Sequence, residues 1–188
     1  MNKERILINK LDTFKKINSI VLGIFLALFG TLLLAISAKV QVPFWPVPMT
    51  MQTFVIFLIG MTYSVRLSFI TVALYLFEGA VGLPVFASGG GITYLTGPTA
   101  GYLYGMLLAV ITISYFANLG FSKTYLKATF SLLIGSIIIF TIGILYLGSI
   151  IGFEKAIVVG LMPFIPSEIF KMALAVALIP TLHKIIKN

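Results

Sequence analysis

Long apolar runs, separated by short polar segments, occupy most of the chain. The first runs from Ile17 to Ala38 without a charged residue, which exceeds the roughly 20 residues that a helix needs to cross a bilayer. Five more apolar segments follow at about residues 49–63, 67–83, 98–119, 128–153 and 156–182. This pattern predicts an all-α membrane protein with six transmembrane helices.

A short basic segment precedes the first apolar run. Residues 1–16 hold five Lys and Arg residues, and Leu7, Leu11 and Phe14 recur at helical spacing, which favours an amphipathic surface helix. A cleaved signal peptide is disfavoured because its apolar core spans only about 7–15 residues. We therefore expect a cytoplasmic amphipathic segment at 1–16 and a six-helix transmembrane domain at 17–188.

The composition agrees with a membrane protein and excludes other classes. Hydrophobic residues make up 60% of the chain and charged residues only 10%, against about 45–50% and 25% in soluble domains. This excludes a soluble globular protein, and also a disordered chain, which has few apolar residues. Cysteine is absent, which excludes disulfides, thiolate metal sites and a cysteine nucleophile.

Membrane topology explains the net charge of +8. If the N-terminus is cytoplasmic, ten of the thirteen Lys and Arg residues fall in inside segments, and only Lys39 and Lys155 fall outside. The positive-inside rule therefore places both termini in the cytoplasm. Since topology accounts for the charge, we exclude nucleic-acid binding and expect a multi-pass protein of the cytoplasmic membrane.

The two long outside loops are more elaborate than the inside connections. The segment from Lys39 to Pro48 contains three prolines, which restrict the backbone and remove hydrogen-bond donors. The segment from Ala87 to Pro98 contains three consecutive glycines, which permit backbone conformations closed to other residues. Their shared position outside predicts capture of a ligand from that side.

Three ionisable residues, Glu78, Glu168 and Lys171, lie within the apolar segments, and we expect all three in the outer half of the bilayer. Each costs at least about 2.5–3.5 kcal/mol there, so such residues mark functional sites by default. The last two share a helix face because they are three residues apart. Pro163 and Pro166 interrupt the segment before them, and Pro166 suits the first residue of a new half-helix. The pair either binds a ligand or neutralises itself, and Glu78 either binds a ligand or is solvated.

Several side chains near the outside loops have two interpretations. Trp45 suits either a ligand wall or the aromatic belt at the membrane interface, and Tyr94 and Tyr102 share this ambiguity. Gln52 and Thr53 can hydrogen-bond either a ligand or a neighbouring helix.

Small residues recur every four positions in the first apolar segment. Gly23, Ala27, Thr31 and Ala35 form a continuous strip, which lets another helix approach closely in lipid. The strip predicts either packing within this chain's own bundle or docking of a partner membrane protein. The sequence favours neither alternative.

The sequence lacks motifs for enzymatic chemistry. It has no phosphate-binding Gly-x-x-x-x-Gly-Lys-Ser/Thr motif, so we do not expect this chain to hydrolyse ATP. It also has no His-Glu-x-x-His zinc motif, and its single histidine disfavours a hydrolytic triad. We expect a protein that is not an enzyme and uses no cofactor or metal.

Four stretches of the sequence resemble one family. They are Val42–Phe54, Gly82–Ala87 with the glycine run that follows, Gly97–Tyr102 and Pro166–Lys171. Together they resemble BioY, the biotin-binding substrate-specificity (S) component of energy-coupling factor (ECF) transporters. The resemblance extends from about the first apolar segment to the end of the chain.

The resemblance implies an S-component-like bundle that binds biotin near the outer face and takes it up across the membrane. It also implies partners, namely a transmembrane T subunit, which docks at the strip of small residues, and ATP-binding cassette (ABC) ATPases. An S component for another vitamin, and a membrane-embedded enzyme that uses Glu168 and Lys171 as acid and base, remain alternatives. The expected substrate-binding residues are Trp45, Ser88, Gly89, Gly90, Gly91, Tyr94, Glu168 and Lys171, followed by Glu78 and Gln52.

Overall fold

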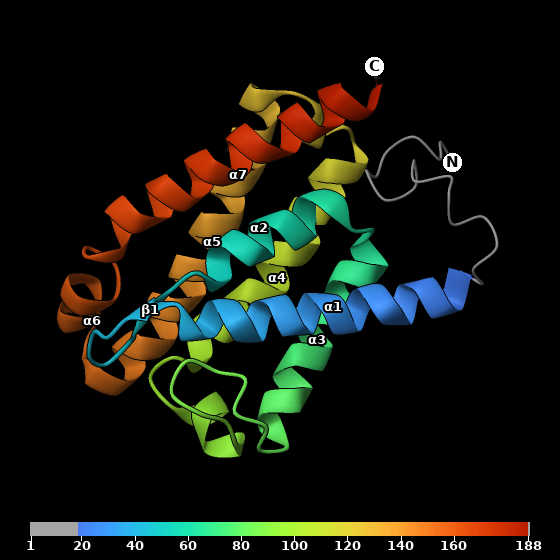
Figure 1. Cartoon of the computed structure of the whole chain (residues 1–188). Helices are drawn as coiled ribbons and strands as arrows, with labels where there is room; N and C mark the ends of the chain where they lie inside the picture. Colours follow the sequence, from blue (N-terminus) through green and yellow to red (C-terminus); the bar gives the residue numbers. More distant parts are fainter. Residues whose placement is uncertain (1–18, 188) are drawn as a thin grey trace.

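The computed structural model describes the backbone of residues 19–187 and the side chains of residues 20–181. The described chain is helical almost throughout (Figure 1). Its α-helices are α1 (Ser19–Lys39), α2 (Gln52–Thr62), α3 (Val65–Ala80), α4 (Ala100–Asn118), α5 (Tyr125–Ile151), α6 (Phe153–Gly160) and α7 (Phe164–Lys187). The remaining elements are the 3₁₀ helices η4 (Ile92–Thr96) and η5 (Phe121–Lys123) and the strands β1 (Gln41–Val42) and β2 (Met49–Thr50). The amphipathic segment predicted at 1–16 lies outside the described residues.

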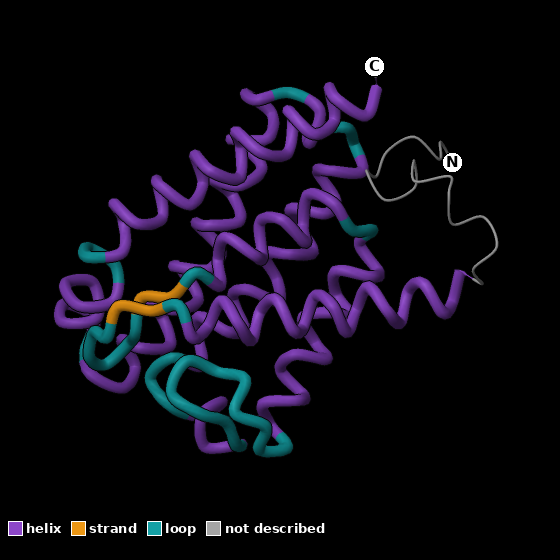
Figure 2. The backbone as a smooth tube through the Cα atoms, in the orientation of Figure 1, coloured by secondary structure: helices purple, strands orange, loops and turns teal. Residues whose placement is uncertain are grey.

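The helices form one bundle. In Figure 1, α1, α2 and α7 run across the front, and α3, α4 and α5 cross behind them. The start of α1 and the end of α7 lie toward the right of this view, whereas β1 and α6 lie at its left. The long loop between α3 and α4 lies at the bottom (Figure 2).

A short hairpin, which the sequence pattern did not predict, forms within the first proline-rich loop. Strands β1 and β2 pair antiparallel, with Gln41 opposite Thr50 and Val42 opposite Met49. The N–H of Met51 then lies 3.2 Å from the carbonyl oxygen of Ser37. The hairpin therefore brings the start of α2 back to the end of α1.

Helices α4 and α5 pack closely because glycines lie along their contact. A Cβ atom added at Gly105 of α4 would lie 2.8 Å from the Cα atom of Ile139 on α5. On α5, a Cβ atom at Gly135 would collide with Ile113, and one at Gly143 would collide with the ring of Tyr102. Small residues at such contacts let helix backbones approach closely in a membrane.

The six predicted segments correspond to helices of unequal length. Within the described residues, α1, α4, α5 and α7 are long and apolar enough to cross a membrane. Helix α2 has 11 residues and α3 has 16. At 1.5 Å per residue, α3 is about 24 Å long, against a hydrocarbon core of about 30 Å. The all-helical class is confirmed, and the number of six spans stays a prediction.

The sixth predicted segment is divided into two helices. Helix α6 ends at Gly160 and α7 begins at Phe164, so the predicted interruption exists. Its position differs slightly, because the new helix begins two residues before Pro166. The proline lies in the first turn of α7, where its missing N–H removes no helical hydrogen bond.

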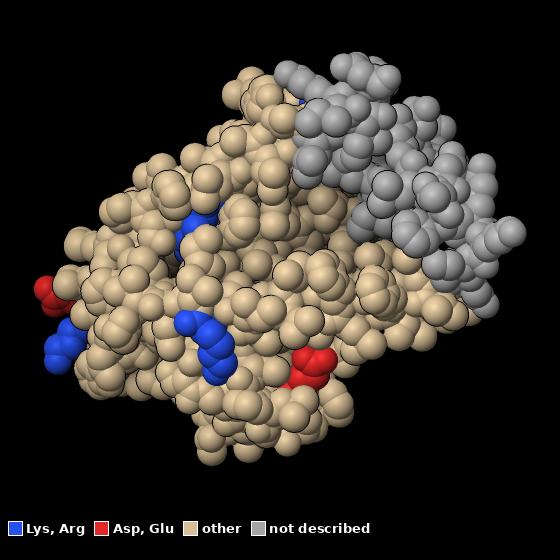
Figure 3. Space-filling view, in the orientation of Figure 1, with Lys and Arg blue, Asp and Glu red and all other residues tan. Residues whose placement is uncertain are grey.

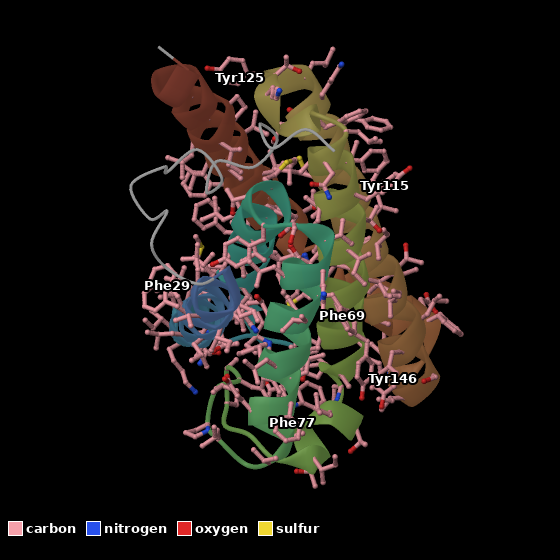
Figure 4. The ribbon with its side chains drawn as sticks, turned by 90° about the vertical axis from the view of Figure 1, so that its right-hand side faces the viewer. Phe29, Phe69, Phe77, Tyr115, Tyr125 and Tyr146 are labelled. Carbon is pink, nitrogen blue, oxygen red and sulfur yellow. The ribbon has the colours of Figure 1, made fainter. Side chains whose placement is uncertain are left out.

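Apolar side chains cover the outside of the bundle. Charged atoms are sparse on the face shown in Figure 3. Large aromatic residues project from the outer surfaces of α1, α3, α4 and α5 in Figure 4, and Phe77 and Tyr115 are 62% and 57% exposed. Exposed apolar surface of this extent marks a membrane or protein contact rather than a water-facing surface.

Candidate functional site

A small cavity lies where α2, α4, α5, α7 and the loop between α3 and α4 meet. It leaves about 50 Å³ free, which is room for a few water molecules. Mostly apolar walls with a few polar groups are usual for a small-molecule site. The lining residues are Val47, Pro48, Thr50, Gln52, Thr53, Phe86, Ala87, Tyr94, Thr99, Tyr102, Leu103, Met106, Ile139, Phe140, Phe164, Glu168 and Lys171.

Glu168 and Lys171 form a buried ion pair in the wall of this cavity. Lys171 Nζ lies 2.8 Å from Glu168 Oε2. Their spacing of three residues on α7 brings both side chains to one face of the helix. Charges buried this deeply are tolerated only when they are paired and hydrogen-bonded.

Hydroxyl groups from two other helices complete the pair. Thr53 of α2 donates to Glu168 Oε2 at 2.8 Å and accepts from Lys171 Nζ at 2.6 Å. Ser136 of α5 donates to Glu168 Oε1 at 3.0 Å, and Lys171 Nζ also donates to the Thr50 carbonyl oxygen at 3.3 Å. An ammonium group has three N–H donors, so all those of Lys171 are engaged. A ligand that reaches this ammonium must replace one of its present partners.

Aromatic rings form two groups in the wall of the cavity. Phe86, fully buried, meets Tyr75 edge to face with ring centroids 5.4 Å apart and stacks on Tyr94 at 4.8 Å. In the second group, Tyr102 stacks on Phe164 with ring centroids 6.4 Å apart. Such rings offer flat apolar surfaces, which favour a planar or fused-ring ligand.

A second polar network ties the loop wall to α2 and α3. Gln52 Nε2 donates to the hydroxyl of Tyr75 at 2.8 Å, and this hydroxyl donates to the carbonyl oxygen of Val85 at 2.9 Å. Thr50 Oγ1 donates to Gln52 Oε1 at 2.9 Å. The amide of Gln52 therefore orients the loop wall in addition to lining the cavity.

Comparison with known sequences identifies the family. A sequence profile of the BioY family matches residues 9–188. This chain belongs to the BioY family.

Two relatives illustrate the match to BioY sequences. A protein of Rickettsia prowazekii (strain Madrid E), named a probable biotin transporter BioY, is 34% identical over 166 residues, 88% of this chain and 85% of the relative. The biotin transporter BioY of Thermotoga maritima is 35% identical over 157 residues, 82% of this chain and 92% of the relative.

A solved structure shares the fold of this BioY-family chain. It is the crystal structure of the S-component for biotin from an ECF-type ABC transporter. The TM-score is 0.76 at 24% sequence identity, with 89% of this chain and 92% of that chain covered. The likeness identifies the fold as that of an S component.

Four of the residues predicted for the BioY site line the cavity. Gln52, Tyr94, Glu168 and Lys171 come from α2, η4 and α7. Although up to 119 positions separate them along the chain, the bundle brings them to one cavity. The ion pair is internally neutralised, as one of the two alternatives expected, and it is also adjacent to the cavity, while its binding of a ligand stays a prediction.

Trp45, a candidate substrate-binding residue, does not line the cavity. Its side chain is 85% exposed, whereas Val47, two residues later in the same loop, is buried and lines the cavity with Pro48. The loop thus turns the indole outward. This position agrees with the alternative interpretation of Trp45 as an interfacial aromatic residue.

Glu78 and Ser88 also lie outside the cavity lining. Glu78 Oε1 accepts a hydrogen bond of 3.1 Å from the Thr31 hydroxyl, so the carboxylate connects α3 to α1. Ser88 is exposed at the tip of a turn in which Phe86 and Gly89 form an antiparallel bridge. This bridge directs Phe86 into the cavity wall and Ser88 away from it.

The three predicted glycines shape the loop without lining the cavity. Gly89 and Gly91 adopt φ values of +135° and +102°, which are unfavourable for residues with a side chain. A Cβ atom at Gly90 would collide with the carbonyl group of Leu83. The Gly91 N–H donates to the Gly79 carbonyl oxygen at 2.7 Å. The glycine run therefore folds the loop against α3 and positions the aromatic residues beside it.

The strip of small residues on α1 faces the chain's own bundle over its middle. Ala27 and Thr31 are each 4% exposed, and the Thr31 hydroxyl donates a hydrogen bond to Glu78 of α3. Ala35 is half-buried, and Gly23 lines a groove between α1 and the α2–α3 turn. Internal packing, one of the two predicted alternatives, therefore describes Ala27 and Thr31.

Several important residues carried no clear signal in the sequence. Ser136 lies in a long apolar run with no motif around it, and Met106 and Phe164 resemble ordinary core residues. Only the tertiary structure brings them to the cavity. Within the described residues, no group of three or more His, Cys, Asp or Glu side chains is arranged to hold a metal ion.

Proposed function

We propose that this chain is the biotin-specific S component of an ECF transporter and takes up biotin across the cytoplasmic membrane. One observation carries the proposal most strongly. In a chain of the BioY family, a buried Glu168–Lys171 pair lies in the wall of a cavity with aromatic walls. The names of the relatives, which are biotin transporters, support the choice of ligand.

The chemistry of biotin complements these side chains. Its fused rings suit the surfaces of Phe86, Tyr94 and Tyr102, and its ureido group offers N–H donors and a carbonyl acceptor. The carboxylate of Glu168 accepts from a ureido N–H. The ammonium of Lys171 donates either to the ureido oxygen or to the tail carboxylate. Such charge-assisted hydrogen bonds are shorter and stronger than neutral ones.

The cavity must widen to hold this ligand. Its free space of about 50 Å³ is far below the roughly 300–1,000 Å³ of typical ligand pockets. The loop between α3 and α4 supplies Phe86, Ala87 and Tyr94 to the wall, and the loop between α1 and α2 supplies Val47 and Pro48. Movement of the part of the α3–α4 loop that carries Tyr94 gives the ligand room without repacking the close α4–α5 contact.

The topology that fits uptake has six spans with both termini inside. The four long apolar helices supply four spans, and α2 and α3 supply the two shorter ones. Of the Lys and Arg residues, only Lys39 and Lys155 then lie outside, which satisfies the positive-inside rule. The cavity and both elaborate loops face outward in this orientation, toward the source of the vitamin.

Transport also requires partners with ATPase activity, since this sequence has no phosphate-binding loop. A T subunit and ABC ATPases provide it in the proposed assembly. The T subunit docks along α1, at the edge of the small-residue strip where Gly23 borders an open groove. The buried Ala27 and Thr31 hold α1 on α3 beside that edge.

Two alternatives lead to different measurements. An S component for another vitamin would bind thiamine or riboflavin in place of biotin. An embedded enzyme that uses Glu168 as an acid would convert its ligand, whereas members of this family are named as transporters.

Equilibrium binding of labelled biotin to the purified protein tests the proposal. We expect tight, saturable binding that unlabelled biotin abolishes and that thiamine and riboflavin leave unchanged. We also expect the biotin released from the protein to be chemically unchanged, which distinguishes binding from catalysis. Binding of another vitamin without biotin binding overturns the proposal. Uptake into cells with and without the T subunit then tests the partner.

A further inference from the structure

Three consecutive carbonyl groups in the cavity wall are held by side chains from three separate elements. The carbonyl oxygen of Val85 accepts from the Tyr75 hydroxyl at 2.9 Å. That of Phe86 accepts from Lys39 Nζ at 2.5 Å. That of Ala87 accepts from Gln41 Nε2 at 3.3 Å and lies 3.5 Å from Lys39 Nζ. We call Lys39, Gln41 and Tyr75 the loop anchor.

The anchored segment carries part of the cavity wall. Phe86 is fully buried and Ala87 is 6% exposed, and both line the cavity. Backbone carbonyls of a loop usually bond to water or to neighbouring backbone groups. Here three in succession accept hydrogen bonds from side chains of α3, α1 and β1, so the position of the wall depends on elements that lie far from it in the sequence.

Lys39 is the strongest member of the loop anchor. It is the last residue of α1, and no carboxylate lies within ion-pair distance of it among the described residues. Its charge is therefore directed to carbonyl oxygens, where a charged donor makes a hydrogen bond about twice as strong as a neutral donor does. The structural role of Lys39 is thus to fasten the loop to the end of α1.

We propose that Lys39 is a positioning residue for ligand binding, which holds the wall segment 85–87 closed over the cavity through the loop anchor. It acts on the ligand through Phe86 and Ala87 and does not itself line the cavity. When the ammonium is removed, the wall opens more often, and the ligand leaves faster. The expected faster loss of the ligand rests on the proposed function, whereas the expected opening of the wall does not.

A cysteine reporter tests the position of the wall without any ligand. Because the chain contains no cysteine, Ala87→Cys creates a single thiol that is almost fully buried in the closed wall. We expect a small charged thiol reagent to label this variant about tenfold faster when Lys39→Met is added, since losing about 1.4 kcal/mol of closure is a factor of ten. Lys39→Arg, which keeps a charged donor, should restore slow labelling.

Matched controls and a second readout complete the test. Lys155→Met removes another exposed lysine and should leave the labelling rate unchanged. If Ala87→Cys does not fold, judged by gel filtration, Val85→Cys replaces it as the reporter. In the protein without cysteine, Lys39→Met should raise the biotin dissociation rate about tenfold. If Ala87→Cys with Lys39→Met is labelled within twofold of the rate of Ala87→Cys alone, the proposal about Lys39 is overturned. If labelling becomes fast but the native protein binds no biotin, only the proposed function is overturned.

Discussion

Lys171 Nζ lies 2.8 Å from Glu168 Oε2, one turn earlier on the same helix, and the two side chains are only 2% and 6% exposed. Both charges are therefore held away from water and depend on each other for compensation. Removing one partner leaves an uncompensated buried charge, which costs about 3–5 kcal/mol. Binding experiments on this pair must therefore separate the loss of the fold from the loss of the site.

Replacing the lysine should abolish most of the affinity. We expect Lys171→Ala to weaken biotin binding at least about tenfold, equivalent to about 1.4 kcal/mol, and to lower the melting temperature. The double variant Glu168→Gln with Lys171→Met should regain thermal stability, since neither residue then carries a charge. Isothermal binding and thermal unfolding measure the two effects. A double variant that binds biotin like the native protein would show that the pair is only structural.

The hydroxyl of Thr53 should matter more than its methyl group. Thr53→Val keeps the shape but leaves Glu168 and Lys171 each without one partner, which costs about 1–3 kcal/mol for each unsatisfied group. We expect biotin affinity to fall about tenfold or more, while Thr53→Ser stays within about threefold of the native protein. Equal losses in both variants would refute this role for the hydroxyl.

Trp45 and Tyr94 should differ sharply in a binding assay. The indole of Trp45 is 85% exposed, so Trp45→Ala should change the dissociation constant less than about threefold. Tyr94 stacks on Phe86 in the cavity wall, so Tyr94→Ala should weaken binding about tenfold through lost stacking and burial. A large effect of Trp45→Ala would mean that the proline-rich loop turns inward when the ligand binds.

A methyl group at Gly79 should disturb the cavity from outside it. A Cβ atom there would collide with the ring of Phe86, so Gly79→Ala must displace the ring that forms the wall. We expect biotin binding to weaken about tenfold, since crowding a packed site costs about 1–3 kcal/mol. Gly23→Ala is the matched control, because nothing lies within 4 Å of the added atom. Normal binding by Gly79→Ala would indicate a wall that adapts freely.

The proposed orientation predicts opposite labelling of two exposed lysine positions. In intact cells, a membrane-impermeant thiol reagent should label Lys155→Cys and should reach Lys123→Cys only after the cells are lysed. Because the sequence contains no cysteine, labelling of this protein reports only on the introduced residue. The reverse pattern would place the cavity on the cytoplasmic side and contradict uptake from outside.

The sequence predicted those features that depend on local pattern. Uncharged runs indicated the helices, and buried charges identified Glu168 and Lys171, because both signals arise from the cost of polar groups in lipid. Pro163 and Pro166 located the break before α7 to within two residues. Family resemblance added the ligand, which no periodicity reveals.

The sequence did not predict which way the loop side chains face. The sequence allows Trp45 as either a ligand wall or an interfacial residue, and in the structure Val47, two residues later, takes the inward position. Likewise, the sequence does not reveal that the glycine run shapes the loop that supplies Phe86. Ser136 was missed because a serine in an apolar run becomes informative only when α5 packs beside α7. These features depend on tertiary contacts, which local sequence does not encode.

The cavity draws its walls from four helices and two loops, so it exists only once the whole bundle has assembled. A molecule that binds there therefore binds the native protein and not the unfolded chain. By mass action, ligand at one hundred times its dissociation constant adds about 2.7 kcal/mol to the free energy of unfolding. The protein with bound ligand should therefore unfold at a higher temperature than the same protein without it.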